Sequence, residues 1–180
     1  MLALLAALPV VIAACGDDDG AATAPAASTR SGAAVEAPSG ADAAPFAEAF
    51  AGATTLDGSV FDPVRLAGTD AVIWFWAPWC TICRGEAADV AALARRRAGE
   101  VTFVGVAGRD ELDAMREFVD ETGTGSFTHV ADLDGSVWSA FGVYGQPAYA
   151  FVDDTGGIEV FVGGLGGDAL AERIDELLAT

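Results

Sequence analysis

The feature that most constrains this chain is a pair of cysteines, Cys80 and Cys83, that directly follows an apolar run at residues 72–76. The run is continuous and rich in β-branched and aromatic residues, which is typical of a strand buried on both faces. A helical pattern begins at Cys80, with early acidic residues, late arginines and a closing Gly99. This order predicts a helix with Cys80 at its N-terminus, where unpaired N–H groups and the dipole favour the thiolate. Such an arrangement is typical of dithiol–disulfide exchange.

The spacing also predicts a role for each residue of the motif. We expect Cys80 to form the mixed disulfide with a substrate, the more buried Cys83 to resolve it, and Trp79 to shield one side of the sulfur pair. A zinc site is disfavoured, because zinc takes four nitrogen or sulfur ligands and only Cys15 and His129 remain as candidates. A purely structural disulfide is disfavoured too, because so short a loop contributes little stability through chain entropy.

The rest of the pattern alternates strands with helices. An Asp57-Gly58 turn signal with apolar flanks predicts a β-hairpin ahead of the buried strand. Downstream we expect a buried strand at 101–107, helices at 110–122 and near 134–141, strands at 148–152 and 158–162, and a final helix at 168–178. This order predicts an α/β domain with a mostly parallel sheet, flanked by helices and finished by an antiparallel hairpin. It is the layout of the thioredoxin fold, with an N-terminal β-hairpin extension and a central helical insertion.

Two further residues are candidates for the site. His129 precedes residues 130–132 at an expected strand edge, and we interpret it as a structural histidine with satisfied hydrogen bonds. Pro147 immediately precedes the strand at 148–152, and because proline cannot donate to a sheet ladder it begins the strand or lies in a turn. A cis Gln146–Pro147 bond would place the main-chain groups of Gln146 beside the cysteines, where a bound peptide can pair with them.

The N-terminus has the pattern of a targeting signal. The apolar run at residues 2–14 would reach only ~20 Å as a helix, short of the ~30 Å hydrocarbon core, and fits the h-region of a signal peptide. The run ends in Ile12-Ala13-Ala14-Cys15, which resembles a bacterial lipobox with Cys15 as the lipidated first residue. No basic residue precedes the run. Either a basic n-region is missing, which we favour, or the segment is a buried apolar helix rather than a signal.

Composition sets the remaining limits. The chain has 180 residues and a formal net charge of −18, so no basic stripe exists to neutralise phosphates, and we expect no nucleic-acid partner. Residues 15–43 are rich in Ala, Gly, Pro and Asp and predict a disordered acidic tether. Residues 44–180 are the predicted thioredoxin-like domain.

The motifs resemble those of a known group. Residues 75–84, with the sequence Phe-Trp-Ala-Pro-Trp-Cys-Thr-Ile-Cys-Arg, are similar to the extracytoplasmic thioredoxin-like proteins of the TlpA/ResA/DsbE group. The Gln-Pro-Ala of residues 146–148 is similar to the secreted DsbE- and DsbF-like proteins of actinobacteria. The resemblance implies that Pro147 is the family's cis-proline. It also implies that Glu86, three residues after Cys83, is an active-site glutamate that relays protons or tunes the thiol pKa values; its alternative role is ordinary helix charge.

The same resemblance implies a function. It points to an extracytoplasmic thiol–disulfide oxidoreductase, secreted or anchored by lipid to the outer face of the cell membrane, with protein thiols and disulfides as substrates. The redox-active disulfide would need no added cofactor, and a membrane redox partner of the DsbD/CcdA or VKOR type would recycle it. Residues 146–148 favour an oxidising role over a reductase serving cytochrome c maturation. Thr81-Ile82 replaces the family's usual dipeptides, so the direction of electron flow is not carried over.

Proteins of other classes share parts of this pattern. A peroxidase of the peroxiredoxin type needs Thr or Ser three residues before its reactive cysteine, where this chain has Ala77. A metal-binding lipoprotein of this fold would use a wider cysteine spacing and a histidine. Trp74 stands where cytosolic thioredoxins carry a buried aspartate, which makes a general thioredoxin-like reductase a weaker alternative.

Overall fold

The computed structural model describes residues 34–36 and 47–180. The chain divides into two units, Met1–Arg30 and Ser31–Thr180, and every described residue belongs to the second. The predicted signal segment, Cys15 and most of the predicted tether therefore lie outside the described residues. In the part of the chain that is described, no helix is long and apolar enough to cross a membrane.

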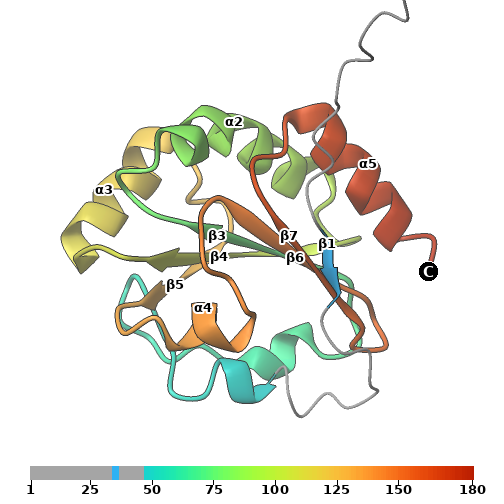
Figure 1. Cartoon of the computed structure of the whole chain (residues 1–180), viewed down its shortest axis with the longest axis horizontal. Helices are drawn as coiled ribbons and strands as arrows, with labels where there is room; N and C mark the ends of the chain where they lie inside the picture. Colours follow the sequence, from blue (N-terminus) through green and yellow to red (C-terminus); the bar gives the residue numbers. More distant parts are fainter. Residues whose placement is uncertain (1–33, 37–46) are drawn as a thin grey trace, which may run out of the picture. The chain divides into compact units, whose positions relative to one another are not determined.

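A seven-stranded sheet of order β1-β7-β6-β3-β4-β5-β2 forms the middle layer (Figure 1). Its centre consists of three parallel strands, β3 (Ala71–Trp76), β4 (Thr102–Gly108) and β5 (Thr128–Asp132). Next to β3 lies β6 (Ala148–Val152), which runs antiparallel to it, and β7 (Ile158–Val162) runs antiparallel to β6. The C-terminal strand bounds coincide with those predicted.

The sheet is less parallel than predicted. At the two edges, β1 (Ala34–Glu36) pairs antiparallel with β7, and β2 (Thr54–Thr55) pairs antiparallel with β5. Of the six strand pairings among the described residues only two are parallel, so the prediction of a mostly parallel sheet is wrong outside the centre. The antiparallel β6–β7 pair was predicted, because a short turn permits no parallel pairing. The antiparallel pairings that were not predicted are those of β6 with β3 and of the edge strands β1 and β2.

Two further differences concern strands that sequence did not predict. β1 lies inside the segment predicted to be a disordered tether, and it pairs with the main chain of β7, which would otherwise present unpaired groups at the sheet edge. β5 is absent from the predicted element order, although a strand edge was expected at residues 130–132, because its polar residues break the apolar pattern. The predicted hairpin is present as a tight Asp57-Gly58 turn, closed by a bridge between Thr54 and Val60.

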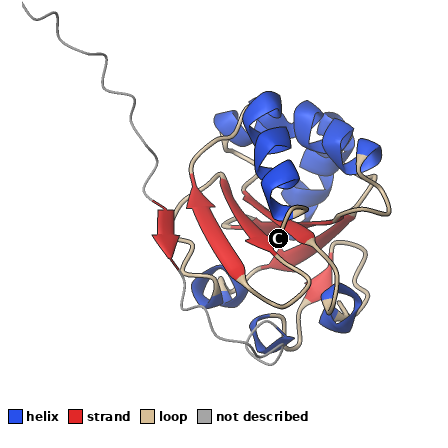
Figure 2. Cartoon of the chain, turned by 90° about the vertical axis from the view of Figure 1, so that its right-hand side faces the viewer, coloured by secondary structure: helices blue, strands red, loops and turns tan. Residues whose placement is uncertain are grey.

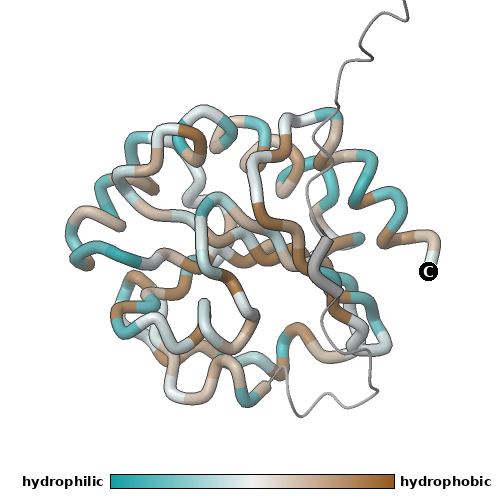
Figure 3. The backbone as a smooth tube through the Cα atoms, viewed as in Figure 1, coloured by the Kyte–Doolittle hydropathy of each residue, from teal (hydrophilic) through white to brown (hydrophobic). Residues whose placement is uncertain are grey.

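Helices cover both faces of the sheet (Figures 1 and 2). One face carries α2 (Thr81–Arg96), α3 (Leu112–Thr122) and α5 (Gly167–Leu177). The other carries the short α4 (Ser136–Ala140) and the 3-10 turn η1 (Pro63–Leu66). Apolar residues are concentrated on the central strands and hydrophilic ones on the outer helices (Figure 3).

The strand that leads to the cysteines is buried on both faces, as predicted. Trp74 and Trp76 pack into the core beneath α2, α3 and α5, while Ile73 and Phe75 pack into the core beside α4. Every residue of β3 has 0% exposure. The C-terminal end of β3, just before the cysteine-bearing helix, is therefore held in place by core packing on both sides of the sheet.

Candidate active site

The cysteine pair lies at the start of α2. Cys80 is the N-cap residue, with an extended backbone (φ −74°, ψ 109°), and its sulfur accepts a hydrogen bond from the Cys83 N–H at 3.0 Å. The two residues form a disulfide with their Cα atoms 5.3 Å apart. Cys80 is 6% exposed and Cys83 is fully buried, so Cys80 is the outer sulfur. In the reduced protein the helix N-terminus would stabilise a Cys80 thiolate.

The first turn of α2 carries no acidic residue. The sequence pattern places Glu86 and Asp89 early enough to complement the helix dipole, but the helix starts at Thr81 and both lie beyond that turn. The positive end of the helix therefore faces the Cys80 sulfur without a competing carboxylate.

Glu86 lies inside the protein rather than on the helix surface. It is 6% exposed, and its two carboxylate oxygens accept hydrogen bonds from Trp74 Nε1 (2.9 Å) and from the Leu165 N–H (3.1 Å). Burial raises the pKa of Glu86 to about 6, while the nearby Tyr149 hydroxyl, Trp74 and Leu165 oppose that increase and Asp89 adds to it. Trp74, which stands in place of a buried aspartate, thus binds a buried carboxyl group supplied by α2.

The segment that contains Pro147 approaches the cysteine-bearing helix α2 at Gly164, a residue without a side chain. The Gln146–Pro147 bond is cis, as the family resemblance implied, and Pro147 precedes β6 beside the end of β3. The Pro147 carbonyl accepts a hydrogen bond from the Gly163 N–H (2.9 Å). A Cβ on Gly164 would lie 2.9 Å from Ile82 Cγ2, 3.2 Å from Glu86 Oε2 and 3.7 Å from Pro147 Cγ. The structure therefore brings the helix, Glu86 and Pro147 together, and only glycine fits where they meet.

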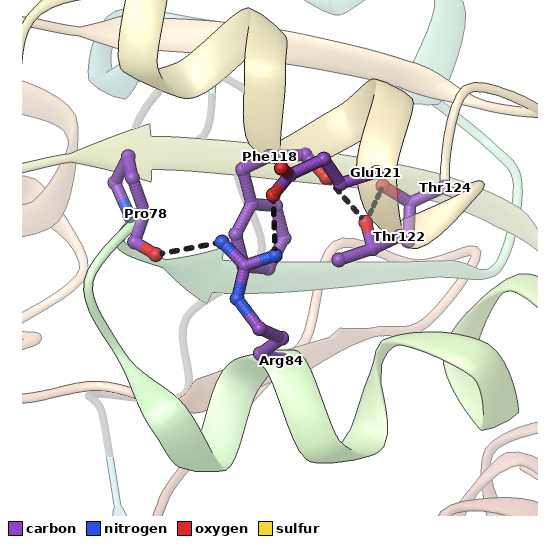
Figure 4. A network of polar contacts seen from close by, with 6 residues as sticks. All are labelled: Pro78, Arg84, Phe118, Glu121, Thr122 and Thr124. Carbon is purple, nitrogen blue, oxygen red and sulfur yellow. Dashed lines mark hydrogen bonds and ion pairs between the residues drawn. The ribbon is translucent and has the colours of Figure 1, made fainter.

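Arg84, directly after the second cysteine, ties the cysteine segment to α3 (Figure 4). Its Nη1 contacts Glu121 Oε2 at 2.7 Å, its Nη2 donates to the Pro78 carbonyl at 3.4 Å, and its guanidinium lies 4.9 Å from the centroid of the Phe118 ring. Because Pro78 lies two residues before Cys80, Arg84 links the segment that precedes the outer cysteine to α3.

The rim around the cysteines is apolar and exposed. Trp79 is 55% exposed, Ile82 59% and Tyr144 69%, whereas Gln146 is half-buried. The Trp79 indole donates to the Arg109 carbonyl at 3.1 Å, and the Arg109 guanidinium donates to the Tyr144 carbonyl at 2.8 Å. The sequence analysis did not identify Arg109. The one signal that could have indicated it is its position directly after the buried strand β4.

His129 has both ring nitrogens engaged, which matches its interpretation as a structural residue. Its Nδ1 accepts from Trp76 Nε1 at 3.2 Å, so Nε2 carries the proton and donates to the Thr124 carbonyl at 3.0 Å. Burial lowers the pKa of His129 to about 4, against a smaller opposing effect of Thr124. In the described residues, no group of three or more His, Cys, Asp or Glu side chains is arranged to hold a metal ion.

Comparison with known proteins identifies relatives of this chain. The chain is 43% identical over 99 residues to the soluble secreted antigen MPT53 of Mycobacterium tuberculosis, a match that covers 55% of this chain and 56% of that protein. It is 30% identical over 104 residues to the thiol:disulfide interchange protein DsbE of Pseudomonas aeruginosa, covering 54% and 56%. The match thus spans little more than half the length of these relatives.

Solved structures cover more of the domain. The structure of MTB DsbF in its mixed oxidised and reduced forms is 52% identical, with a TM-score of 0.67, over 69% of this chain and 92% of that one. A secreted Mycobacterium tuberculosis disulfide oxidoreductase homologous to E. coli DsbE is 38% identical, with a TM-score of 0.66, over 69% and 94%. These similarities confirm the thioredoxin-like fold.

A protein-family model matches a larger part of the chain than the curated relatives do. The AhpC/TSA family model matches residues 41–161, a range that holds the cysteine helix and every strand from β2 to β6. Since the match contains both the fold and the cysteine pair, the chain belongs to the AhpC/TSA family.

Proposed function

We propose that this protein is a thiol–disulfide oxidoreductase that acts outside the cytoplasm and oxidises the thiols of protein substrates. The observation that carries the proposal is the position of the Cys80 sulfur, which caps the N-terminus of α2 and receives the Cys83 N–H. A thiolate stabilised in this way is a good leaving group, so the disulfide that it forms is readily transferred to another thiol.

The exchange balances without any other reactant. A substrate thiolate attacks Cys80 Sγ, the Cys80–Cys83 bond breaks, and Cys83 leaves as a thiolate that takes up a proton. A second substrate thiolate then attacks the substrate sulfur of the mixed disulfide and releases the Cys80 thiolate. The substrate loses two electrons and gains a disulfide, while the enzyme gains two electrons and becomes a dithiol.

Glu86 is proposed to donate a proton to the Cys83 thiolate and to accept it again when the thiol is oxidised. It lies one helical turn beyond Cys83, is buried, and has a pKa raised to about 6 by that burial, so it exchanges protons near neutral pH. Trp79, Gln146 and Pro147 are proposed to contact the substrate. The exposed rim formed by Trp79, Ile82 and Tyr144 supports this role, because exposed aromatic and aliphatic side chains next to a reactive group suit a polypeptide partner.

The location rests on a relative and the direction on the sequence. A secreted disulfide oxidoreductase of 38% identity supports a location outside the cytoplasm. The oxidising direction is proposed from the Gln-Pro-Ala of residues 146–148 alone. Attachment through Cys15, or secretion after cleavage of the signal, is proposed from the lipobox-like sequence alone. Reoxidation of the dithiol would require a membrane partner of the VKOR type, whereas a DsbD/CcdA-type partner would fit the reductase alternative.

The equilibrium reduction potential of the Cys80/Cys83 pair tests the direction. A potential near about −120 mV is that of a strong oxidant, and one near about −270 mV is that of a reductant. Titration against glutathione, monitored by alkylation of the free thiols, is expected to give the higher value. A value at or below about −270 mV would replace the oxidase with the reductase.

A trapping experiment tests the chemistry itself. Cys83→Ala should accumulate a mixed disulfide between Cys80 and a reduced substrate peptide after mild oxidation, while the control Cys80→Ala should form none. Consumption of hydrogen peroxide by Cys83→Ala at a rate comparable to its peptide exchange would favour the peroxidase alternative instead.

A further inference from the structure

Arg109 connects the two chain segments that carry the proposed substrate contacts. Its main-chain carbonyl accepts from the Trp79 indole at 3.1 Å, and its guanidinium Nη2 donates to the Tyr144 carbonyl at 2.8 Å. Trp79 is the residue before Cys80, and Tyr144 lies three residues before Pro147. One exposed residue of the β4–α3 loop therefore contacts both the cysteine segment and the proline segment.

The backbone of Arg109 is strained, and the contacts of this residue hold it in that conformation. Arg109 has φ 61°, and among the described residues it is the only one other than glycine with a positive φ. This conformation is energetically unfavourable for an L-residue, whereas glycine adopts it readily. A strained conformation persists where surrounding contacts over-determine it, and here those contacts are made by the guanidinium and the carbonyl.

A third contact fixes the direction of the guanidinium. It lies 5.0 Å from the centroid of the Trp138 ring, and Trp138 is itself 3% exposed, with its Nε1 donating to the Val106 carbonyl at 3.3 Å. Gly108 allows this packing, since a Cβ there would lie 2.8 Å from the Trp138 ring. The guanidinium thus rests on a buried indole and makes no ion pair with the described carboxylates.

We infer that Arg109 is a positioning residue for polypeptide substrates, which sets the distance between Trp79 and the segment that ends in Pro147. This inference rests on the proposed function, because it concerns how a substrate is held while its sulfur meets Cys80. A peptide that contacts both segments depends on their separation, whereas a small dithiol needs only access to the sulfur.

Arg109→Gly separates these cases. Glycine accepts φ 61° without strain and keeps the carbonyl that binds Trp79, so the variant loses only the guanidinium contacts. We expect kcat/KM for oxidation of a reduced cysteine-pair peptide to fall about tenfold, mostly through KM, which corresponds to ~1.4 kcal/mol. The rate with dithiothreitol and the reduction potential should stay at the wild-type values. Arg109→Lys should restore part of the loss, since it keeps one charged donor.

Two controls distinguish loss of substrate positioning from other effects: Arg95→Ala tests the loss of a positive charge, and the rate with dithiothreitol tests for a general defect of the protein. Arg95→Ala removes an exposed arginine in the last turn of α2 and should leave the peptide kinetics unchanged. A peptide kcat/KM for Arg109→Gly within twofold of wild type would overturn the inference, as would an equal loss with dithiothreitol. The variant-to-wild-type ratio is measured in whichever direction the wild type exchanges disulfides, so it stays informative for a reductase. A wild type that exchanges none refutes the proposed function itself.

Discussion

The buried Glu86 carboxyl makes the stability of the oxidised protein depend on pH in a calculable way. Its pKa is raised from 4.5 to about 6, with burial as the main cause. The folded protein therefore holds this proton more tightly than the unfolded chain does. The stabilising contribution is fully present below pH 4.5 and is lost as pH rises through 6, and it amounts to about 2 kcal/mol at 1.36 kcal/mol per pKa unit.

Glu86→Gln isolates that contribution. Glutamine does not titrate, and with one carbonyl oxygen it loses one of the two hydrogen bonds from Trp74 and Leu165, a cost of about 1–3 kcal/mol that does not vary with pH. The difference in unfolding free energy between wild type and variant should therefore shrink by about 2 kcal/mol between pH 4 and pH 7.5. The sign follows from burial, because only the wild type carries a buried charge at the higher pH.

His129 changes stability in the opposite direction. Its pKa is lowered from 6.5 to about 4, so its contribution is present above pH 6.5 and is lost as pH falls through 4. Because wild type and Glu86→Gln share this histidine, its effect cancels in the difference between them. Measuring the difference, rather than either curve alone, is therefore essential.

The assay is urea unfolding of the oxidised protein over this pH range. Oxidised protein is required because the Cys80 and Cys83 sulfurs do not titrate while they are joined. Glu117→Gln, which changes an exposed glutamate of α3, controls for the substitution itself. A wild-type to Glu86→Gln difference that stays constant from pH 4 to pH 7.5 would refute the argument that burial raises the pKa of this carboxyl.

Two further predictions concern the sheet. Gly105→Ala places a Cβ in steric overlap with His129 and 2.9 Å from Trp76 Nε1. It should lower the unfolding free energy, measured in urea, by about 2–3 kcal/mol. The control Gly125→Ala, whose nearest contact is at 3.6 Å, should change the unfolding free energy little. Asp132→Ala leaves two main-chain N–H groups at the start of α4 without their acceptor and should cost about 1–3 kcal/mol; an unchanged urea midpoint would contradict that reading of its hydrogen bonds.

Sequence predicted the features that depend on local pattern. The apolar run at residues 72–76 was predicted to be a buried strand and lies within the fully buried β3, which begins one residue earlier, and the cysteine pair marked the start of α2. The hairpin strands Ala148–Val152 and Ile158–Val162 were found at their predicted bounds because two largely apolar runs flank a turn that contains Gly156 and Gly157. In these cases the sequence neighbours alone determine the structure.

The features that sequence missed depend on hydrogen-bond partners in other elements of the fold. β5 contains His129 and Asp132, polar residues that are buried because Trp76 and the first turn of α4 supply their hydrogen bonds. For Glu86 the family resemblance implied an active-site role, with ordinary helix charge as the alternative, but the sequence did not indicate its burial or its hydrogen bonds from Trp74 and Leu165. Trp76 and Leu165 come from segments far from His129 and Glu86 in the sequence, whereas the groups that bind Asp132 follow it by five and six residues, in the next element of the chain.

The pairing of β1 with β7 also affects how copies of the domain meet. Its three residue pairs occupy main-chain donors and acceptors that β7 would otherwise offer to a strand from another molecule. At the opposite margin of the sheet, β2 is two residues long, too short to template much further growth. Both edge strands, β1 and β2, are therefore short, and neither offers a long row of main-chain donors and acceptors to a strand of another molecule.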